Sequence, residues 1–177
     1  IILKKYGKIE LQPSFITSSL NTENISDVEG FKQAIKTLFD NADIKGREIS
    51  VAISDASIKI AFLEFEDLPK DKQKGIELIK WNLKKTLPFP ADEAIVEFQT
   101  LDTPSEGNRF YKLIAVLIKK VVLEQYEKIL NSCHLFPVRI VPSSFAVYNL
   151  YHNYLFQLPI CAILTVSLKR ITFMAVR

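Results

Sequence analysis

The segment Leu87-Pro88-Phe89-Pro90 constrains the fold of this chain more than any other feature of its sequence. Proline fixes φ and lacks a backbone N–H, so Pro88 and Pro90 end regular structure, while the ring of Phe89 can fill a gap in a core. Apolar residues at helical spacing precede the segment over residues 71–86, and a strand pattern follows it over residues 94–101. The segment therefore predicts a rigid corner between a helix and a strand.

Apolar periodicity along the rest of the chain predicts a mixed α/β protein with hairpins. A capping-box spacing from Ser26 to Glu29 marks the start of the first helix. The expected helices cover residues 27–40, 71–86, 121–133 and 143–156. The expected strands cover residues 1–11 and 14–20, as a small meander, and residues 48–54, 57–65, 94–101, 110–118, 138–141, 160–166 and 171–176.

Three details of these elements have structural interpretations. The strand over residues 57–65 is apolar on both sides, which predicts that both of its faces are covered. Gly75, inside the second helix, either permits a close contact or is a tolerated surface glycine. Trp81, the sole tryptophan, is expected to pack in a core or at its edge in preference to anchoring a partner.

The composition excludes several classes of protein. No apolar run reaches the roughly 18 residues of a membrane-spanning helix, and the paired lysines do not form a basic stripe. The net charge of +3 is too small to indicate nucleic-acid binding, and two cysteines cannot build a disulfide framework. We expect a soluble protein of a reducing compartment, with the cytoplasm favoured.

No motif in the sequence predicts catalysis. The five glycines are too far apart for a GxGxxG motif or a P-loop, and no serine has the flanking glycines of a nucleophile elbow. The cysteines and histidines do not have the spacing of zinc ligands. Side chains that could serve in metal, redox or acid–base chemistry are interpreted as core filler or solvated groups: Cys133, His134, His152, Cys161, Glu64, Glu66, Asp67, Asp92 and Glu93.

The order of motifs around the proline corner resembles the PilM family of type IV pilus assembly proteins, which are actin-like and FtsA-like. The cytoplasmic domain of the GspL family of type II secretion is the second resemblance. The segments that carry the first resemblance are Leu68-Pro69, Leu87-Pro88-Phe89-Pro90 with Glu93, and Phe98-Gln99-Thr100-Leu101. Its flanks are Val51-Ala52-Ile53-Ser54, residues 113–117, Phe136-Pro137 and Ser143-Ser144-Phe145-Ala146.

This resemblance implies the first half of an actin-like, ribonuclease H-like protein. Residues 1–55 and 137–155 would form subdomain 1A, and residues 56–136 would form an inserted, FtsA-type subdomain 1C. Residues 160–177 would be the opening hairpin of a second half, which lies outside this chain.

The resemblance also implies where a nucleotide would bind in relatives, and this sequence departs from that pattern. The first phosphate loop, with Asp-Ile-Gly character, is absent, and the acid and glycine of the second turn are replaced by Thr165 and Ser167. A carboxylate supports the metal at such a turn, and glycine lets the backbone approach phosphate. We expect no cofactor, metal ligand or catalytic residue in this chain, and ATP binding only in a longer one.

PilM-like proteins hold an N-terminal peptide of the inner-membrane protein PilN between subdomains 1A and 1C. The resemblance places this groove between the strand over residues 57–65 and the helix over residues 143–156, lined by Ile60, Phe62 and Phe145. Plain core packing is the alternative for each of these side chains. We expect a non-enzymatic scaffold of a pilus machine at the inner face of the cytoplasmic membrane, with a PilN-like peptide and pilus assembly proteins as partners.

Three alternatives stay open at this point. The chain could be part of an actin-like ATPase whose catalytic residues lie elsewhere, or a GspL-like component of type II secretion. It could also be a degenerate actin-like domain that pairs only with copies of itself.

Overall fold

The computed structural model describes residues 3–105, 107, 109–155, 157, 160–167 and 170–176, and its helices and strands follow the predicted order closely. Within the described chain, no helix is both long and apolar enough to cross a bilayer. The helices are α1 (Val28–Asn41), α2 (Lys72–Leu83), α3 (Lys120–Ser132) and α4 (Ser143–Leu155). The strands are β1 (Glu48–Ile53), β2 (Lys59–Phe65), β3 (Ala94–Asp102), β4 (Tyr111–Lys119), β5 (Phe136–Pro142), β6 (Cys161–Ser167) and β7 (Arg170–Val176).

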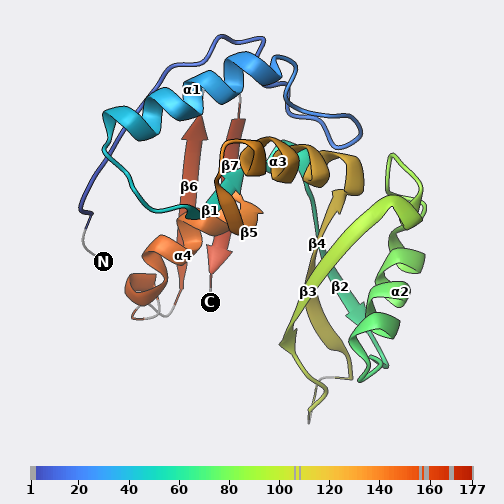
Figure 1. The fold of residues 1–177 in the computed structure, drawn as a ribbon. Coiled ribbons are helices and arrows are strands. Elements are labelled where there is room, and N and C mark those ends of the chain that lie inside the picture. The colour runs from blue at the N-terminus through green and yellow to red at the C-terminus, as the bar shows by residue number, and fades with distance from the viewer. Residues whose placement is uncertain are drawn as a thin grey trace.

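The strands form three small sheets (Figure 1). β1 and β5 pair in parallel, and β6 and β7 form an antiparallel hairpin. The third sheet is antiparallel, in the order β2-β4-β3, and contains the hairpin that the sequence predicts across residues 94–118. Short 3-10 turns, Asp55–Ser57 and Ala91–Glu93, lead into β2 and β3.

The first core lies between α2 and one face of the three-stranded sheet. The buried face of α2 presents Gly75, Ile79 and Leu83 to it. Phe89 is buried in this core, so the predicted corner places its ring as expected. A Cβ on Gly75 would meet Cζ of Phe98 at 3.0 Å, so the first of the two interpretations of this glycine, a close contact, is confirmed.

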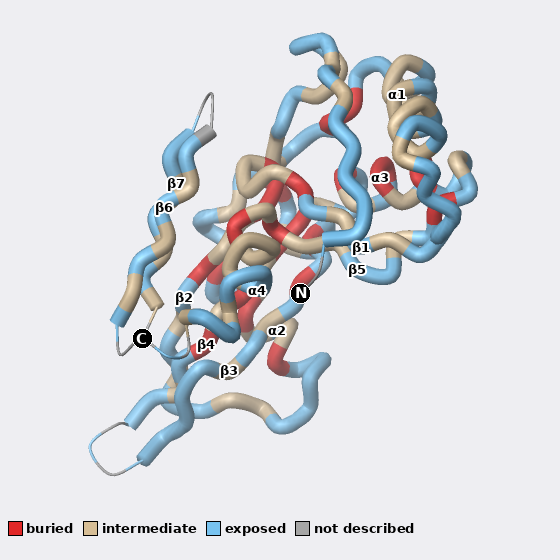
Figure 2. The backbone as a smooth tube through the Cα atoms, turned by 90° about the vertical axis from the view of Figure 1, so that its left-hand side faces the viewer, coloured by how far each residue is buried: buried red, intermediate tan, exposed pale blue. Residues whose placement is uncertain are grey.

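The second core joins α3 to β1, to the start of β2 and to the segment before α1. Its buried members include Ile53, Val122, Tyr126 and Ile129. Figure 2 shows buried residues both around α3 and in the strands of the three-stranded sheet, whereas β6 and β7 are exposed or intermediate. Helix α3 thus contributes to the second core, although the predicted bounds include it in the inserted subdomain; those bounds stay a prediction.

A buried polar contact attaches the segment before α1 to α3. Oε1 of Gln125 accepts hydrogen bonds from the backbone N–H groups of Asn24 and Ile25 at 2.7 and 3.0 Å, and its Nε2 donates to the carbonyl of Ile25 at 2.8 Å. Oδ1 of Asn24 accepts from Oγ of Ser57 at 3.3 Å. The side chain of Gln125 therefore supplies the hydrogen bonds that a neighbouring strand would otherwise supply.

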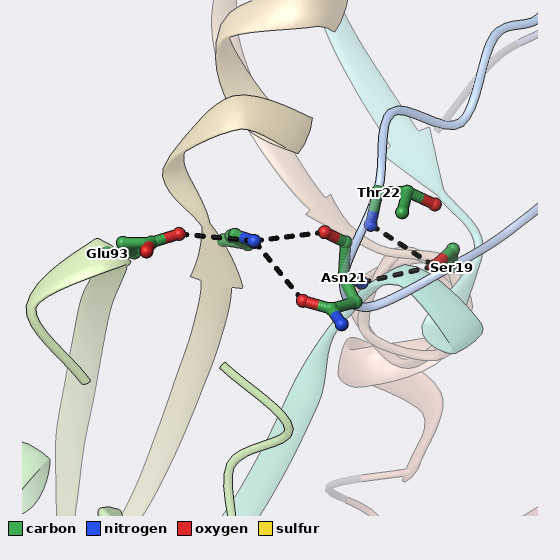
Figure 3. A network of polar contacts seen from close by, with 5 residues as sticks. Ser19, Asn21, Thr22 and Glu93 are labelled. Atoms are coloured by element: carbon green, nitrogen blue, oxygen red, sulfur yellow. Dashed lines mark hydrogen bonds and ion pairs between the residues drawn. The ribbon is translucent and has the colours of Figure 1, made fainter. Parts of the chain in front are cut away.

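Lys119, at the end of β4, ties this same segment to the first core. Its Nζ lies 3.1 Å from a carboxylate oxygen of Glu93 and donates to the backbone oxygen and Oδ1 of Asn21 at 3.1 and 3.2 Å (Figure 3). The ammonium also lies 5.6 Å from the centre of the Phe89 ring, within range of a cation–π interaction. Because the side chain is only 17% exposed, these contacts stabilise the fold more than an ordinary surface ion pair.

The predicted N-terminal meander is wrong. Between residues 3 and 27 the structure has only an isolated antiparallel bridge, from Ile16 to Ile25. Most side chains from residue 3 to residue 14 are exposed, so the alternating apolar residues there have no core to bury them. β propensity is realised only where a neighbouring strand and a core are available.

Two predictions about helices also need correction. The N-cap of α1 is Asp27, whose side chain accepts a hydrogen bond from the N–H of Gly30, so the capping-box spacing from Ser26 marks the cap one residue early. Trp81 is 76% exposed and does not pack in a core. The physical reason is rotational, because the residues that α2 buries lie on the opposite side of the helix from Trp81.

Candidate protein-binding site

The two faces of β2 have different surroundings. Ala61, Leu63 and Phe65 point toward the first core under α2. Ile60 reaches the second core, whereas Phe62, two residues further along the same face, is 73% exposed. The prediction that both faces of this strand are covered is therefore wrong at Phe62, because α2 covers only one face of the sheet.

Cross-strand pairing continues this face of β2, here called the open face, onto β4, where Val116 packs against the second core as Ile60 does. Ile60 pairs with Val116 and Phe62 pairs with Ile114 across β2 and β4. Ile95 of β3, which pairs with Ile118, is exposed at the end of this face. Figure 1 shows α2 on one side of the sheet and the remainder of the chain, including β5 and α4, on the other. The open face is thus apolar on β2 and β4, whereas on β3 it carries the exposed Glu97 and Gln99, which are the register partners of Val116 and Ile114.

Charged pairs flank the apolar part of the open face on β2 and β4. Glu64 and Lys112 are register partners whose charged atoms lie 3.9 Å apart, and Lys72 binds Glu97 at 2.8 Å at the far edge of the sheet. All four side chains are about half exposed or more, so each pair contributes little to stability. A polar rim around an apolar centre is the usual composition of a surface that binds another protein.

The third residue predicted for the groove, Phe145, lies on a different element. Helix α4 packs mainly against β1, β5, β6 and β7, and Phe145 is half-buried at its start. The structure brings Ile60 and Phe62 together on the open face, while Phe145 is linked to them only indirectly. Oδ1 of Asp55 accepts hydrogen bonds from the N–H and Oγ of Ser144, both at 3.1 Å, which holds the start of α4 beside the turn leading into β2.

Thr165 lines a second candidate site, a cavity of about 360 Å³. Its walls come from the segment before α1, the turn that contains Asp55, the start of α4 and the β6–β7 hairpin. Ser167 ends β6, and its side chain lies outside the described residues. The complete lining is Pro13, Ile16, Thr17, Ser18, Ser54, Asp55, Ala56, Ser143, Thr165, Arg170 and Thr172.

The lining of this cavity does not fit a magnesium nucleotide. Asp55 is the only carboxylate among the described lining residues, and it already accepts two hydrogen bonds from Ser144. Hydroxyl groups make up most of the remaining polar lining, and none of the glycines contributes to it. A metal-bound triphosphate needs carboxylate support and backbone that can approach the phosphates closely.

The remaining side chains with reactive chemistry are dispersed. Within the ranges that the structure describes, no group of three or more His, Cys, Asp or Glu could hold a metal ion. Cys133 and His134 line a cavity of about 410 Å³ between α1 and the end of α3. His152 and Cys161 are not among the residues that line it. Cys133 is half-buried at the wall of that cavity and belongs to neither core, contrary to its predicted role as core filler.

Sequence reasoning missed two parts of this arrangement. It did not select Gln125, although a polar residue inside the apolar stripe of a helix is a usable signal of a buried hydrogen bond. It also did not select Ile114 and Val116. The signal for both was present, because the strand over residues 110–118 is apolar on both sides while only one helix follows β2 to cover the sheet.

No family model matches the sequence, and a search of curated proteins finds no match. Among solved structures, a chain of a PilM–PilN type IV pilus biogenesis complex superimposes over 94% of this chain with a TM-score of 0.79 and 18% sequence identity. This chain shares its fold. The mixed α/β class expected from the sequence is confirmed, and the shared fold agrees with the resemblance to the PilM family.

The match covers almost all of this chain but only 49% of the chain from the PilM–PilN complex. This chain therefore spans about half the length of that one. The cytoplasmic domain of EpsL, an inner-membrane component of the type II secretion system of Vibrio cholerae, gives a TM-score of 0.44 and 12% identity over 67% of this chain and 44% of that one.

Proposed function

We propose that this chain is a non-enzymatic scaffold of a type IV pilus or related secretion machine, which binds an extended cytoplasmic peptide of an inner-membrane partner. The observation that carries the proposal is the exposure of Phe62 on the open face. The shared fold with a chain of a PilM–PilN complex supports a PilN-like peptide as the partner. Such a partner would hold the protein at the inner face of the cytoplasmic membrane.

An extended peptide can use both the edge and the face of this sheet. β2 is an outer strand in the order β2-β4-β3, so its outward backbone groups can pair with an added strand. Alternate side chains of that strand would then lie beside Ile60 and Phe62 on the open face. Burying a phenylalanine ring in this way is worth about 2 kcal/mol, a useful share of the binding free energy of a short peptide.

We assign Phe145 to the opposite wall of the same groove. The hydrogen bonds from Ser144 to Asp55 keep the start of α4 close to the turn before β2, so Phe145 is held near the beginning of that strand. The proposal assigns no catalytic role to Asp55, the carboxylate among the described residues of the neighbouring cavity, whose Oδ1 holds the start of α4 through Ser144.

Fluorescence anisotropy with a labelled N-terminal peptide of the cognate inner-membrane partner tests the proposal. We expect saturable binding, and we expect Phe62→Ser to weaken it by about tenfold or more, because about 2 kcal/mol of burial is lost. Phe173→Ser is the matched control, since Phe173 of β7 is similarly exposed at 67% but lies outside the groove.

The possible outcomes test the identity of the partner and the position of the groove separately. Absence of binding at high micromolar protein would contradict a PilN-like partner. Binding that survives polar substitution of Ile60, Phe62 and Phe145 together would contradict the position of the groove, while leaving the partner supported.

A further inference from the structure

The outer face of α2 carries an arrangement that peptide binding on the open face does not use. Trp81 lies on this face, and its side chain is 76% exposed. No hydrogen bond is found for its indole N–H within the described chain. Large, exposed tryptophan side chains are uncommon on proteins that do not use them for binding, because burying the ring elsewhere is strongly favourable. Trp81 is therefore available to a partner outside this chain.

Lysines surround Trp81 on the same face. Helical spacing places Lys74 two turns before it, Lys84 caps the end of the helix, and Lys85 follows in the turn; all three are exposed. Glu77 is the only acidic residue on this face of the helix. The α2 outer face, defined by Lys74, Glu77, Trp81, Lys84 and Lys85, is thus positively charged around a single aromatic ring.

We propose that the α2 outer face docks on an anionic phospholipid surface. Tryptophan prefers the boundary between water and lipid, where its ring lies at the level of the headgroups. Lysines close to the surface are attracted to anionic lipids, and their long apolar stems can remain against the membrane while the ammonium groups reach the phosphates. The two properties occur together on this face.

The position of α2 in the fold makes such contact feasible. Figure 1 shows α2 on the outer flank of the three-stranded sheet, with every other helix on the opposite side of that sheet. A flat surface can therefore approach the α2 outer face without meeting α1, α3 or α4. Neither of the two cavities described above is lined by a residue of this face, and contact with a lipid surface requires no cavity.

Trp81 is the sole tryptophan of the chain and serves as its own probe. We expect its emission to shift to shorter wavelength, and acrylamide quenching to fall, when the 177-residue chain is mixed with vesicles of phosphatidylcholine and phosphatidylglycerol in equal parts. Vesicles of phosphatidylcholine alone are expected to produce neither change. High salt is expected to reverse both, because it screens the attraction between lysines and headgroups.

Charge reversal identifies the residues responsible. The double variant Lys84→Glu with Lys85→Glu is expected to lower vesicle affinity at least 25-fold, since each lysine near the surface is worth about fivefold. The matched control reverses the exposed lysines Lys45 and Lys128, which changes the net charge equally but lies away from α2. Trp81→Ser, followed by vesicle sedimentation, is expected to weaken binding while the unfolding midpoint stays unchanged.

Three results would overturn the proposal. They are an emission spectrum that does not respond to anionic vesicles, an equal response to phosphatidylcholine, and an equal loss in the control double variant. An acidic protein as the true partner would give the first of these results.

Discussion

Gln125 and Ile25 are a hundred positions apart in the chain and pair through two hydrogen bonds in opposite directions. The side-chain amide of Gln125 accepts from the N–H of Ile25 at 3.0 Å and donates to its carbonyl at 2.8 Å. An amide side chain thus reproduces the pairing of one strand with another. It fixes the segment before α1 to α3 at a point where no strand is available to do so.

Replacing Gln125 with leucine is expected to destabilise the fold by about 3 kcal/mol. Leucine keeps a similar volume but leaves the N–H groups of Asn24 and Ile25 and the carbonyl of Ile25 buried without their partner, and each such group costs about 1–3 kcal/mol before relaxation. Urea denaturation followed by circular dichroism measures the change. Gln33→Leu, at an exposed position of α1, is the control and is expected to have almost no effect.

Replacing Phe89 with alanine is expected to cost about 3–5 kcal/mol of unfolding free energy. Its ring is buried in the first core between the end of α2 and the start of β3, and it also lies under the ammonium of Lys119. Phe62→Ala provides the comparison, because Phe62 is exposed and its truncation opens no cavity. Equal denaturation midpoints for the two variants would contradict the role of Phe89 as a core residue.

Stability is expected to fall with rising pH in the alkaline range because of Tyr126. Burial raises the pKa of this phenol above its ordinary value by disfavouring the charged form. The folded state then holds its proton where the unfolded state has lost it, so the unfolding free energy is unaffected below about pH 10 and decreases above it. Tyr126→Phe should reduce that alkaline slope in thermal melts recorded across this range. An identical slope in both proteins would show that the phenol ionises without penalty.

We expect this chain to show no saturable binding of ATP at millimolar magnesium nucleotide. The cavity beside Thr165 has Asp55 as its only carboxylate among the described lining residues, and that group is engaged by Ser144. Isothermal titration calorimetry measures this directly. Stoichiometric heat that disappears in Thr165→Arg, a variant that would fill the cavity, would contradict the expectation.

Local patterns predicted most of the regular elements of this protein. The hairpin of β3 and β4, the corner at Phe89 and the extents of α1 and α3 follow from periodicity, turn residues and proline, which act over a few neighbouring positions. The observed ends of these elements differ from the predicted ends by only a few residues. Such elements depend on neighbouring residues in the sequence, and so the sequence alone predicts them.

The partner of each apolar face was decided by the tertiary structure. Phe62 and Trp81 look like core residues in the sequence, yet both are exposed. Phe62 lies on the face of the sheet that α2 does not cover, and Trp81 lies on the side of α2 that points away from the sheet. Within residues 3–20 the strand pattern formed no strand, whereas Gln125, a polar residue, became a buried part of the second core. Periodicity specifies that a side of a strand or helix is apolar. Whether that side is buried depends on which distant element reaches it, and this is settled only when the whole chain packs together.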